Sequence, residues 1–156
     1  TVLNSRFVAC ERTLPIRIAA HCFDNTDDLF VSPHHRVLIS GSECEVLFGE
    51  PEVFIAAKHL LGLPGVSQGQ DNRKVSYFHL LLPQHEVIYA NGQPTESFFT
   101  GDMACLTLAK NRVAMQNAIA DREIESETAR PTLKAYEAQV LIKALFKHED
   151  QLLRIA

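Results

Sequence analysis

Residues 29–38 read LFVSPHHRVL, which is a short apolar run, a proline followed by two histidines, and the start of a second apolar run. Residues 77–87, YFHLLLPQHEV, share this pattern, with His79 inside the apolar run and His85 just after Pro83. Short apolar runs that end at proline, glycine or other turn residues are typical of β-strands. The two stretches therefore predict strands that carry histidines within them or at their ends.

The residues on either side continue this alternation of strands and turns. Further strand-like runs occupy residues 14–20, 36–40, 45–48, 52–57 and 85–90, and residues 58–61 fit either a strand end or one helical turn. The break at Pro83 indicates a hairpin or a strand with a sharp corner, and Asn91-Gly92 is typical of a tight two-residue turn. Strands at this spacing predict a mainly β fold over residues 1–108.

The character of the chain changes after residue 108. Residues 109–129 are rich in good helix formers, Pro131 ends that segment, and residues 133–155 predict a second helix. This helix either packs on two sides within its own domain or contacts another chain through one stripe. The sequence thus predicts a β-rich core at 1–108 and a helical extension at 109–156 packed on it. The main apolar stripe contains Leu133, Tyr136, Val140, Leu141, Ala144, Leu145, Leu152 and Ile155, and a thinner one contains Ile142, Phe146 and Leu153.

Composition sets the class of protein. The 156 residues are one ordinary domain, and 46% hydrophobic against 22% charged residues is a globular balance. A net charge of -4 with no basic cluster argues against a nucleic-acid partner, and no apolar run reaches membrane-spanning length. The four cysteines, at positions 10, 22, 44 and 105, have no zinc or disulfide spacing. The compartment stays open between the cytoplasm and secretion without a cleavable signal in this chain.

Histidine is the residue type in this chain that is best suited to catalysis or metal binding, because it can act as a general acid, a general base or a metal ligand near neutral pH. His35, His79 and His85 with Glu86 could form a metal-ligand set, although no H-x-H or H-E-x-x-H pattern supports one. No nucleophile elbow, P-loop or G-x-G-x-x-G is present, so no cofactor is expected. Surface histidines at 34 and 35 and a buried structural His79 remain the simpler alternative.

Several stretches together resemble the bacterial branch of the Hint domains, the hedgehog/intein self-processing fold. The resemblance covers most of residues 13–141. It implies a flattened all-β disc with pseudo-twofold symmetry and a helical tail. The stretches that carry it are residues 29–38, 45–50, 56–60, 77–87, 94–98 and 129–138.

The resemblance also implies a reaction. Hint domains cleave the peptide bond before their own first Cys or Ser by an N-to-S or N-to-O acyl shift, so the upstream polypeptide is the substrate. Water, a thiol, a sterol or a following residue then takes the acyl group. The family's T-x-x-H motif is matched by residues 32–35. His35 would contact and protonate the scissile nitrogen, and Ser32 would orient the site by hydrogen bonding.

Two departures from the intein pattern narrow this implication. His79 stands where inteins have an aspartate, and Glu96-Ser97 replaces the terminal His-Asn pair, whereas His85 falls on the later histidine of the pattern. Without that asparagine, splicing and C-terminal cleavage are not expected, and N-terminal cleavage alone remains.

The nucleophile is the largest departure. Only 31 residues precede Ser32, and Cys10 lies in a segment that resembles a later part of the family pattern. The chain is therefore expected to be a fragment without its nucleophile, inactive by itself and inclined to dimerise or exchange strands through open sheet edges. A non-catalytic assembly module and a His-ligated metalloenzyme are the alternatives.

Overall fold

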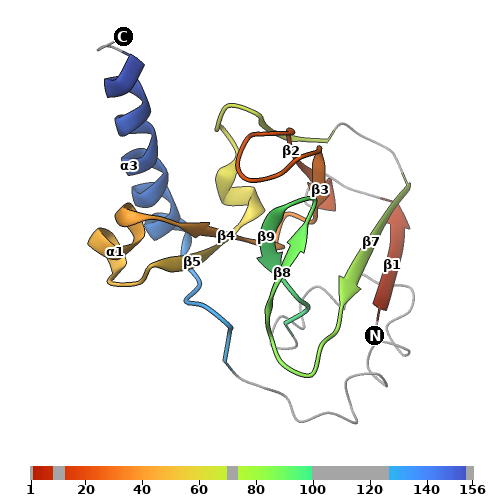
Figure 1. Cartoon of the computed structure of the whole chain (residues 1–156). Helices are drawn as coiled ribbons and strands as arrows, with labels where there is room; N and C mark the ends of the chain where they lie inside the picture. The colour runs from red at the N-terminus through yellow and green to blue at the C-terminus, as the bar shows by residue number, and fades with distance from the viewer. Residues whose placement is uncertain (1, 9–12, 70–73, 100–126, 154–156) are drawn as a thin grey trace.

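The computed structural model describes residues 2–8, 13–69, 74–99 and 127–153, which form small antiparallel sheets and a long C-terminal helix (Figure 1). A two-stranded sheet pairs β1 (Val2–Val8) with β7 (Lys74–Leu80). A three-stranded sheet has the order β3 (Leu29–Val31), β2 (Ile16–Ile18), β6 (Val66–Gln68). A four-stranded sheet has the order β5 (Glu52–Ala56), β4 (Arg36–Ser40), β9 (Gln93–Glu96), β8 (Val87–Ala90). The prediction of a mainly β fold is confirmed.

The core includes residues of the three-stranded sheet, the four-stranded sheet and α3, and β4 and β5 are its most continuously buried strands. Residues 37–39 of β4 and residues 53–55 of β5 are buried without interruption. Such continuous burial explains why these strands have unbroken apolar sequences rather than an alternating pattern. In contrast, β2 alternates, with Ile16 and Ile18 buried and Arg17 between them partly exposed.

The hairpin of β8 and β9 turns at Asn91-Gly92, as the sequence predicts. Asn91 has a φ of 52° and Gly92 a φ of 86°, the left-handed conformations that this kind of turn requires. A Cβ atom on Gly92 would lie 2.9 Å from the carbonyl oxygen of Asp24, so a side chain does not fit there. The turn therefore both reverses the chain and packs against the loop before β3.

Two local predictions were wrong, and for a third segment the structure decides between two predicted alternatives. Residues 45–48 are not a strand but the second half of helix α1 (Ser42–Phe48), which ends at Gly49 in the left-handed conformation. The runs at 75–82 and 85–90 do not form a hairpin with each other, because β7 pairs with β1 and β8 pairs with β9. Residues 57–60 form a single 3₁₀ turn, η2 (Ala57–Leu60), which agrees with the helical alternative.

The predicted C-terminal helix is confirmed as α3 (Ala135–Leu153), whereas the predicted helix at 109–129 falls almost entirely outside the described residues. The buried face of α3 contains Ala138 and Leu141. Tyr136 and Val140 were predicted on this face, yet they are 62% and 48% exposed. The apolar stripe in the sequence is wider than the buried face of the helix, and these two residues lie on its solvent side. No helix in the described ranges is long and apolar enough to cross a membrane.

Candidate functional site

A tight turn at Ser32–His35 fixes the first histidine. The backbone N–H of His35 donates to the carbonyl oxygen of Ser32 over 3.0 Å, with Pro33 at the second position that such turns favour. The N–H of Ala57 donates to the carbonyl oxygen of His35 over 2.9 Å, and that of Lys58 to Pro33 over the same distance. Because η2 holds the turn from the other side, His35 has a fixed position at the start of β4.

A cavity of about 310 Å³ opens beside this turn, between β3, β7 and the β8–β9 hairpin. Its polar lining includes Ser32, His35, His79, Glu96 and Ser97. The N–H of Phe98 donates to the carbonyl oxygen of Leu80 over 2.8 Å, which ties the end of β7 to the chain that leaves β9. The cavity thus brings together chemistry-bearing residues from three parts of the chain.

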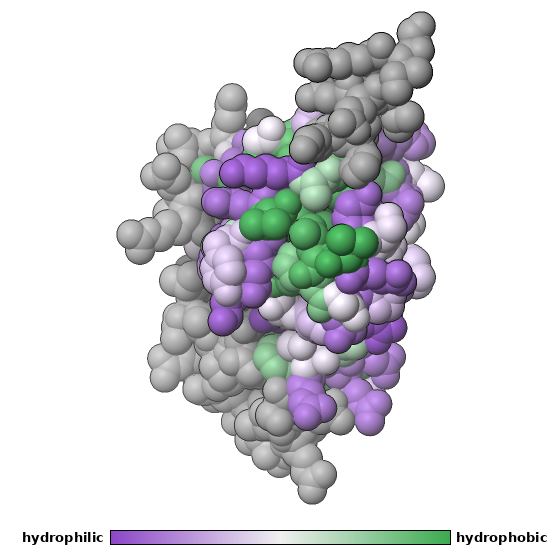
Figure 2. Space-filling model, turned by 90° about the vertical axis from the view of Figure 1, so that its left-hand side faces the viewer, coloured by the Kyte–Doolittle hydropathy of each residue, from purple (hydrophilic) through white to green (hydrophobic). Residues whose placement is uncertain are grey.

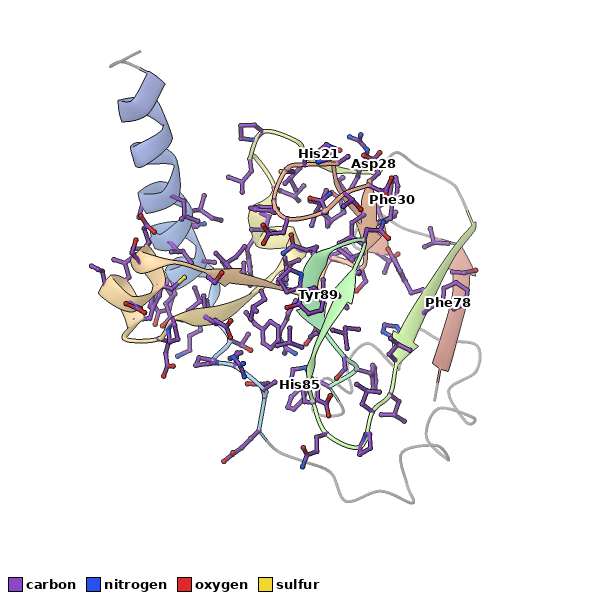
Figure 3. All side chains as sticks on the ribbon, viewed as in Figure 1. His21, Asp28, Phe30, Phe78, His85 and Tyr89 are labelled. Atoms are coloured by element: carbon purple, nitrogen blue, oxygen red, sulfur yellow. The ribbon has the colours of Figure 1, made fainter. Side chains whose placement is uncertain are left out.

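Exposed aromatic side chains surround the opening of this cavity. Phe30 on β3, Phe78 on β7 and Tyr89 on β8 are 57%, 66% and 75% exposed, and all three line it (Figure 3). Each lies next to a buried or half-buried residue on its strand, as the alternation of side chains requires. The cavity lining therefore combines exposed aromatic side chains with buried or half-buried titratable groups.

Glu96 is the buried anion of the site. It is 6% exposed and its carboxylate accepts three hydrogen bonds: from the backbone N–H of Arg36 over 2.7 Å, from the Arg36 guanidinium over 2.6 Å and from His85 Nε2 over 3.2 Å. Burial alone would raise the pKa of Glu96, but the hydrogen bond from His85 and the charges of His35 and Arg36 hold it below its ordinary value. Glu96 is therefore ionised at neutral pH.

His85 lies behind Glu96 rather than in the cavity. Its imidazole contacts the rings of Phe54 and Phe99, with centroids 5.5 and 5.0 Å away. Its Nε2 contacts Glu96, and its Nδ1 accepts a hydrogen bond from the backbone N–H of Ala129 over 2.9 Å. Of the predicted site residues, His85 is the one that does not line the cavity.

His35 and His79 are the two imidazoles that line the cavity. Burial lowers the pKa of His35, the charges of Arg36 and His85 add to that effect, and Glu96 opposes it. Burial and the nearby His35 lower the pKa of His79 to about 4, and Glu96 again opposes the shift. Both rings are thus neutral at neutral pH and free to accept a proton, and Glu96 stabilises the cation that results.

The structure brings Ser32, His35 and His79 to one cavity and puts His85 one layer behind them. The sequence pattern missed the role of Glu96 and Arg36 as an ion pair, with Nη1 and Oε2 2.6 Å apart. A glutamate beside the apolar run Phe98-Phe99 is the signal that could have found it, because a carboxylate in such a setting needs a cationic partner.

The alternative chemistries gain no support from the described residues. Within them, no group of three or more His, Cys, Asp or Glu side chains is arranged to hold a metal ion. Cys44 is buried in the core and Cys22 donates to the carbonyl oxygen of Pro64, and neither lines the cavity. Cys10 lies outside the described residues.

Comparison with known proteins agrees with this architecture. A family model described as a Hint domain matches residues 1–102, about two thirds of the chain. The match includes every strand from β1 to β9 and all the residues that line the histidine cavity. No curated protein and no solved structure matches the chain. On the strength of the family match, this chain belongs to the Hint domain family.

Proposed function

We propose that this chain carries the acid–base centre of a self-processing Hint domain. Its substrate would be its own upstream polypeptide, cleaved before the first Cys or Ser of the complete domain by an N-to-S or N-to-O acyl shift. One observation supports this most directly. His35 and His79, two imidazoles with lowered pKa values, line one cavity with the ionised Glu96.

The chemistry requires a group that accepts a proton and then returns it. An amide is a poor acyl donor because of its resonance and because an unprotonated nitrogen is a poor leaving group. In the proposed step, the nucleophile's proton passes to His35 as the new S–C or O–C bond forms. The C–N bond then breaks as His35 returns this proton to the nitrogen. Water or a thiol afterwards takes the acyl group from the ester or thioester.

The neighbouring residues have supporting roles in this proposal. Glu96 stabilises the imidazolium form of His35 while His35 carries the proton, and Ser32 orients the scissile bond by hydrogen bonding. His79 supplies a second neutral imidazole on the opposite wall, where its ring contacts Phe98 edge-on with centroids 5.2 Å apart. Cys22 and Cys44 do not line the cavity, so neither is proposed as the nucleophile.

Cleavage without splicing is the outcome that we propose. By the resemblance, Glu96 and Ser97 stand at the positions of the intein His-Asn pair, and neither side chain has the amide nitrogen through which asparagine cyclises. Glu96 is held by Arg36 and His85, and the hydroxyl of Ser97 accepts a hydrogen bond from the N–H of Glu86 over 2.9 Å. Both side chains therefore take part in hydrogen bonds that hold the fold together, rather than standing ready to react.

The test is cleavage of the full-length product of the gene, followed by intact mass. We expect a fragment that ends immediately before a Cys or Ser, formed at least about tenfold faster with an added small thiol than without it. Protein held unfolded in urea is the control and should stay intact. Full-length protein that keeps its mass for days under all conditions would refute the proposal.

A second candidate function is a non-catalytic assembly module, and one observation favours it. Apolar side chains gather on the face formed by α1 and α3 (Figure 2). The exposed apolar residues of these two helices include Val46, which is 83% exposed, together with Leu47 and Val140. Singly exposed apolar residues are ordinary, but a cluster on two packed helices is typical of a contact surface.

In this second proposal the partner is another copy of the chain. We expect sedimentation to detect a dimer, and Val46→Asp to weaken it at least about tenfold, because a charge would be buried in an apolar contact. Leu61→Asp is the control, since Leu61 is 39% exposed but lies in the loop after η2. A monomer at high concentration would exclude self-assembly, including strand exchange through the edges of the β1–β7 sheet.

A further inference from the structure

Residues 127–133, here called the return segment, lie beyond the Hint match and are fixed against β5. The N–H of Phe54 donates to the carbonyl oxygen of Pro131 over 2.8 Å, and the N–H of Leu133 donates to the carbonyl oxygen of Phe54 over 2.9 Å. Arg130 Nε lies 2.6 Å from Glu52 Oε2, and Leu133 is buried. The two backbone hydrogen bonds of Phe54 therefore hold the return segment against β5, at residues that follow Ala129 closely in the sequence.

This attachment determines which ring nitrogen of the neutral His85 carries the proton. The N–H of Ala129 donates to Nδ1 over 2.9 Å, so the lone pair of that nitrogen is in use and Nδ1 carries no proton. A neutral imidazole has one N–H, which must then be on Nε2. Nε2 lies 3.2 Å from Glu96 Oε2, where its proton makes the hydrogen bond to the carboxylate.

The opposite tautomer would reverse both contacts. A proton on Nδ1 would face the N–H of Ala129, and the bare lone pair of Nε2 would face the carboxylate of Glu96. Glu96 would then lose one of its three donors, and its orientation would rest on Arg36 alone. The groups that face His85 are the carboxylate of Glu96 of β9, the backbone N–H of Ala129 and the rings of Phe54 and Phe99, and His35 interacts with it electrostatically.

We propose that the return segment is part of the site and that the amide of Ala129 is a positioning group. It selects the Nε2–H tautomer of His85, and this tautomer holds Glu96 in the orientation from which its charge acts on His35. The effect on cleavage rests on the proposed function, whereas the selection of the tautomer does not.

The test measures the tautomer directly. In the ¹⁵N-labelled full chain at neutral pH, two-bond ¹H–¹⁵N spectra should give His85 an unprotonated Nδ1 and a protonated Nε2. Ala129→Pro removes the N–H, and we expect the unprotonated Nδ1 signal to be lost. Ala129→Gly keeps the N–H and should keep the signal. An unchanged tautomer in the proline variant, or its loss in the glycine variant as well, would overturn the proposal.

A second measurement covers the case in which Ala129→Pro does not fold. In the unmodified chain at neutral pH, the amide of Ala129 should exchange with solvent far more slowly than a free amide. Exchange at the rate of a free amide would refute the contact. If the tautomer is as expected while the full-length protein never cleaves, the proposed function fails and this inference stands.

Discussion

Glu96→Ala is expected to lower the free energy of unfolding by about 3–5 kcal/mol, the range for breaking a buried ion pair from one side. The variant removes the carboxylate that accepts hydrogen bonds from the Arg36 guanidinium, the Arg36 backbone N–H and His85 Nε2. The side chains of Arg36 and Glu96 are only 12% and 7% exposed, so water cannot replace the carboxylate easily. Urea-induced unfolding at pH 7 measures the change.

A matched control exists in the same chain. Glu52 pairs with Arg130 at 2.6 Å, the same separation as in the Arg36–Glu96 pair, but those side chains are 35% and 44% exposed. Glu52→Ala should therefore cost about 1 kcal/mol or less, because solvent screens an exposed pair. Equal losses in the two variants would mean that Glu96 is solvated in solution and that the buried network is not what stabilises the site.

The pH dependence of the stability that Glu96 contributes follows from the direction of its pKa shift. Because the pKa of Glu96 lies below its ordinary value of 4.5, the folded chain binds fewer protons than the unfolded chain between the two values. The contribution of Glu96 is complete above pH 4.5 and is lost as the pH falls through the folded pKa. The difference between unmodified protein and Glu96→Ala should accordingly shrink in acid.

Local sequence signals predicted the strands well where burial is simple. The runs that became β4 and β5 are covered on both faces, and Asn91-Gly92 has the backbone conformation that its side chains favour. Helix α1 was missed because its apolar residues are not its buried ones. Val46 is 83% exposed, whereas the small Cys44 is buried, so the run looks like a strand when side chains alone are considered.

The same contrast between local and long-range information applies to the site. His35 and His79 were found through motifs, but they are 44 positions apart, and no local pattern says that β7 faces the turn at Ser32–His35. The partners Arg36 and Glu96 are 60 residues apart and meet because β4 and β9 are neighbours in one sheet. The contact between His85 and Ala129 requires the return segment to lie against β5, which only the folded backbone determines.

His35→Ala should slow cleavage of the full-length protein by about 10²–10⁴-fold, the usual contribution of a positioned acid–base group. His35 takes the nucleophile's proton and returns it to the nitrogen, and alanine can do neither. His21→Asn is the control. His21 is exposed, and asparagine tolerates its positive φ of 61°. The rate is followed by intact mass after a thermal melt has shown that each variant folds.

The pH profile separates this role from a merely structural one. His35 must begin as a free base, so the rate should fall as the pH is lowered and the imidazole becomes protonated. Because burial lowers the pKa of His35 from its ordinary 6.5, the midpoint of that fall should lie below pH 6.5. An undiminished rate in His35→Ala would remove His35 from the mechanism. A midpoint above 6.5 in the unmodified protein would mean that the attraction of Glu96 outweighs burial, and His35 would then begin the reaction as the acid.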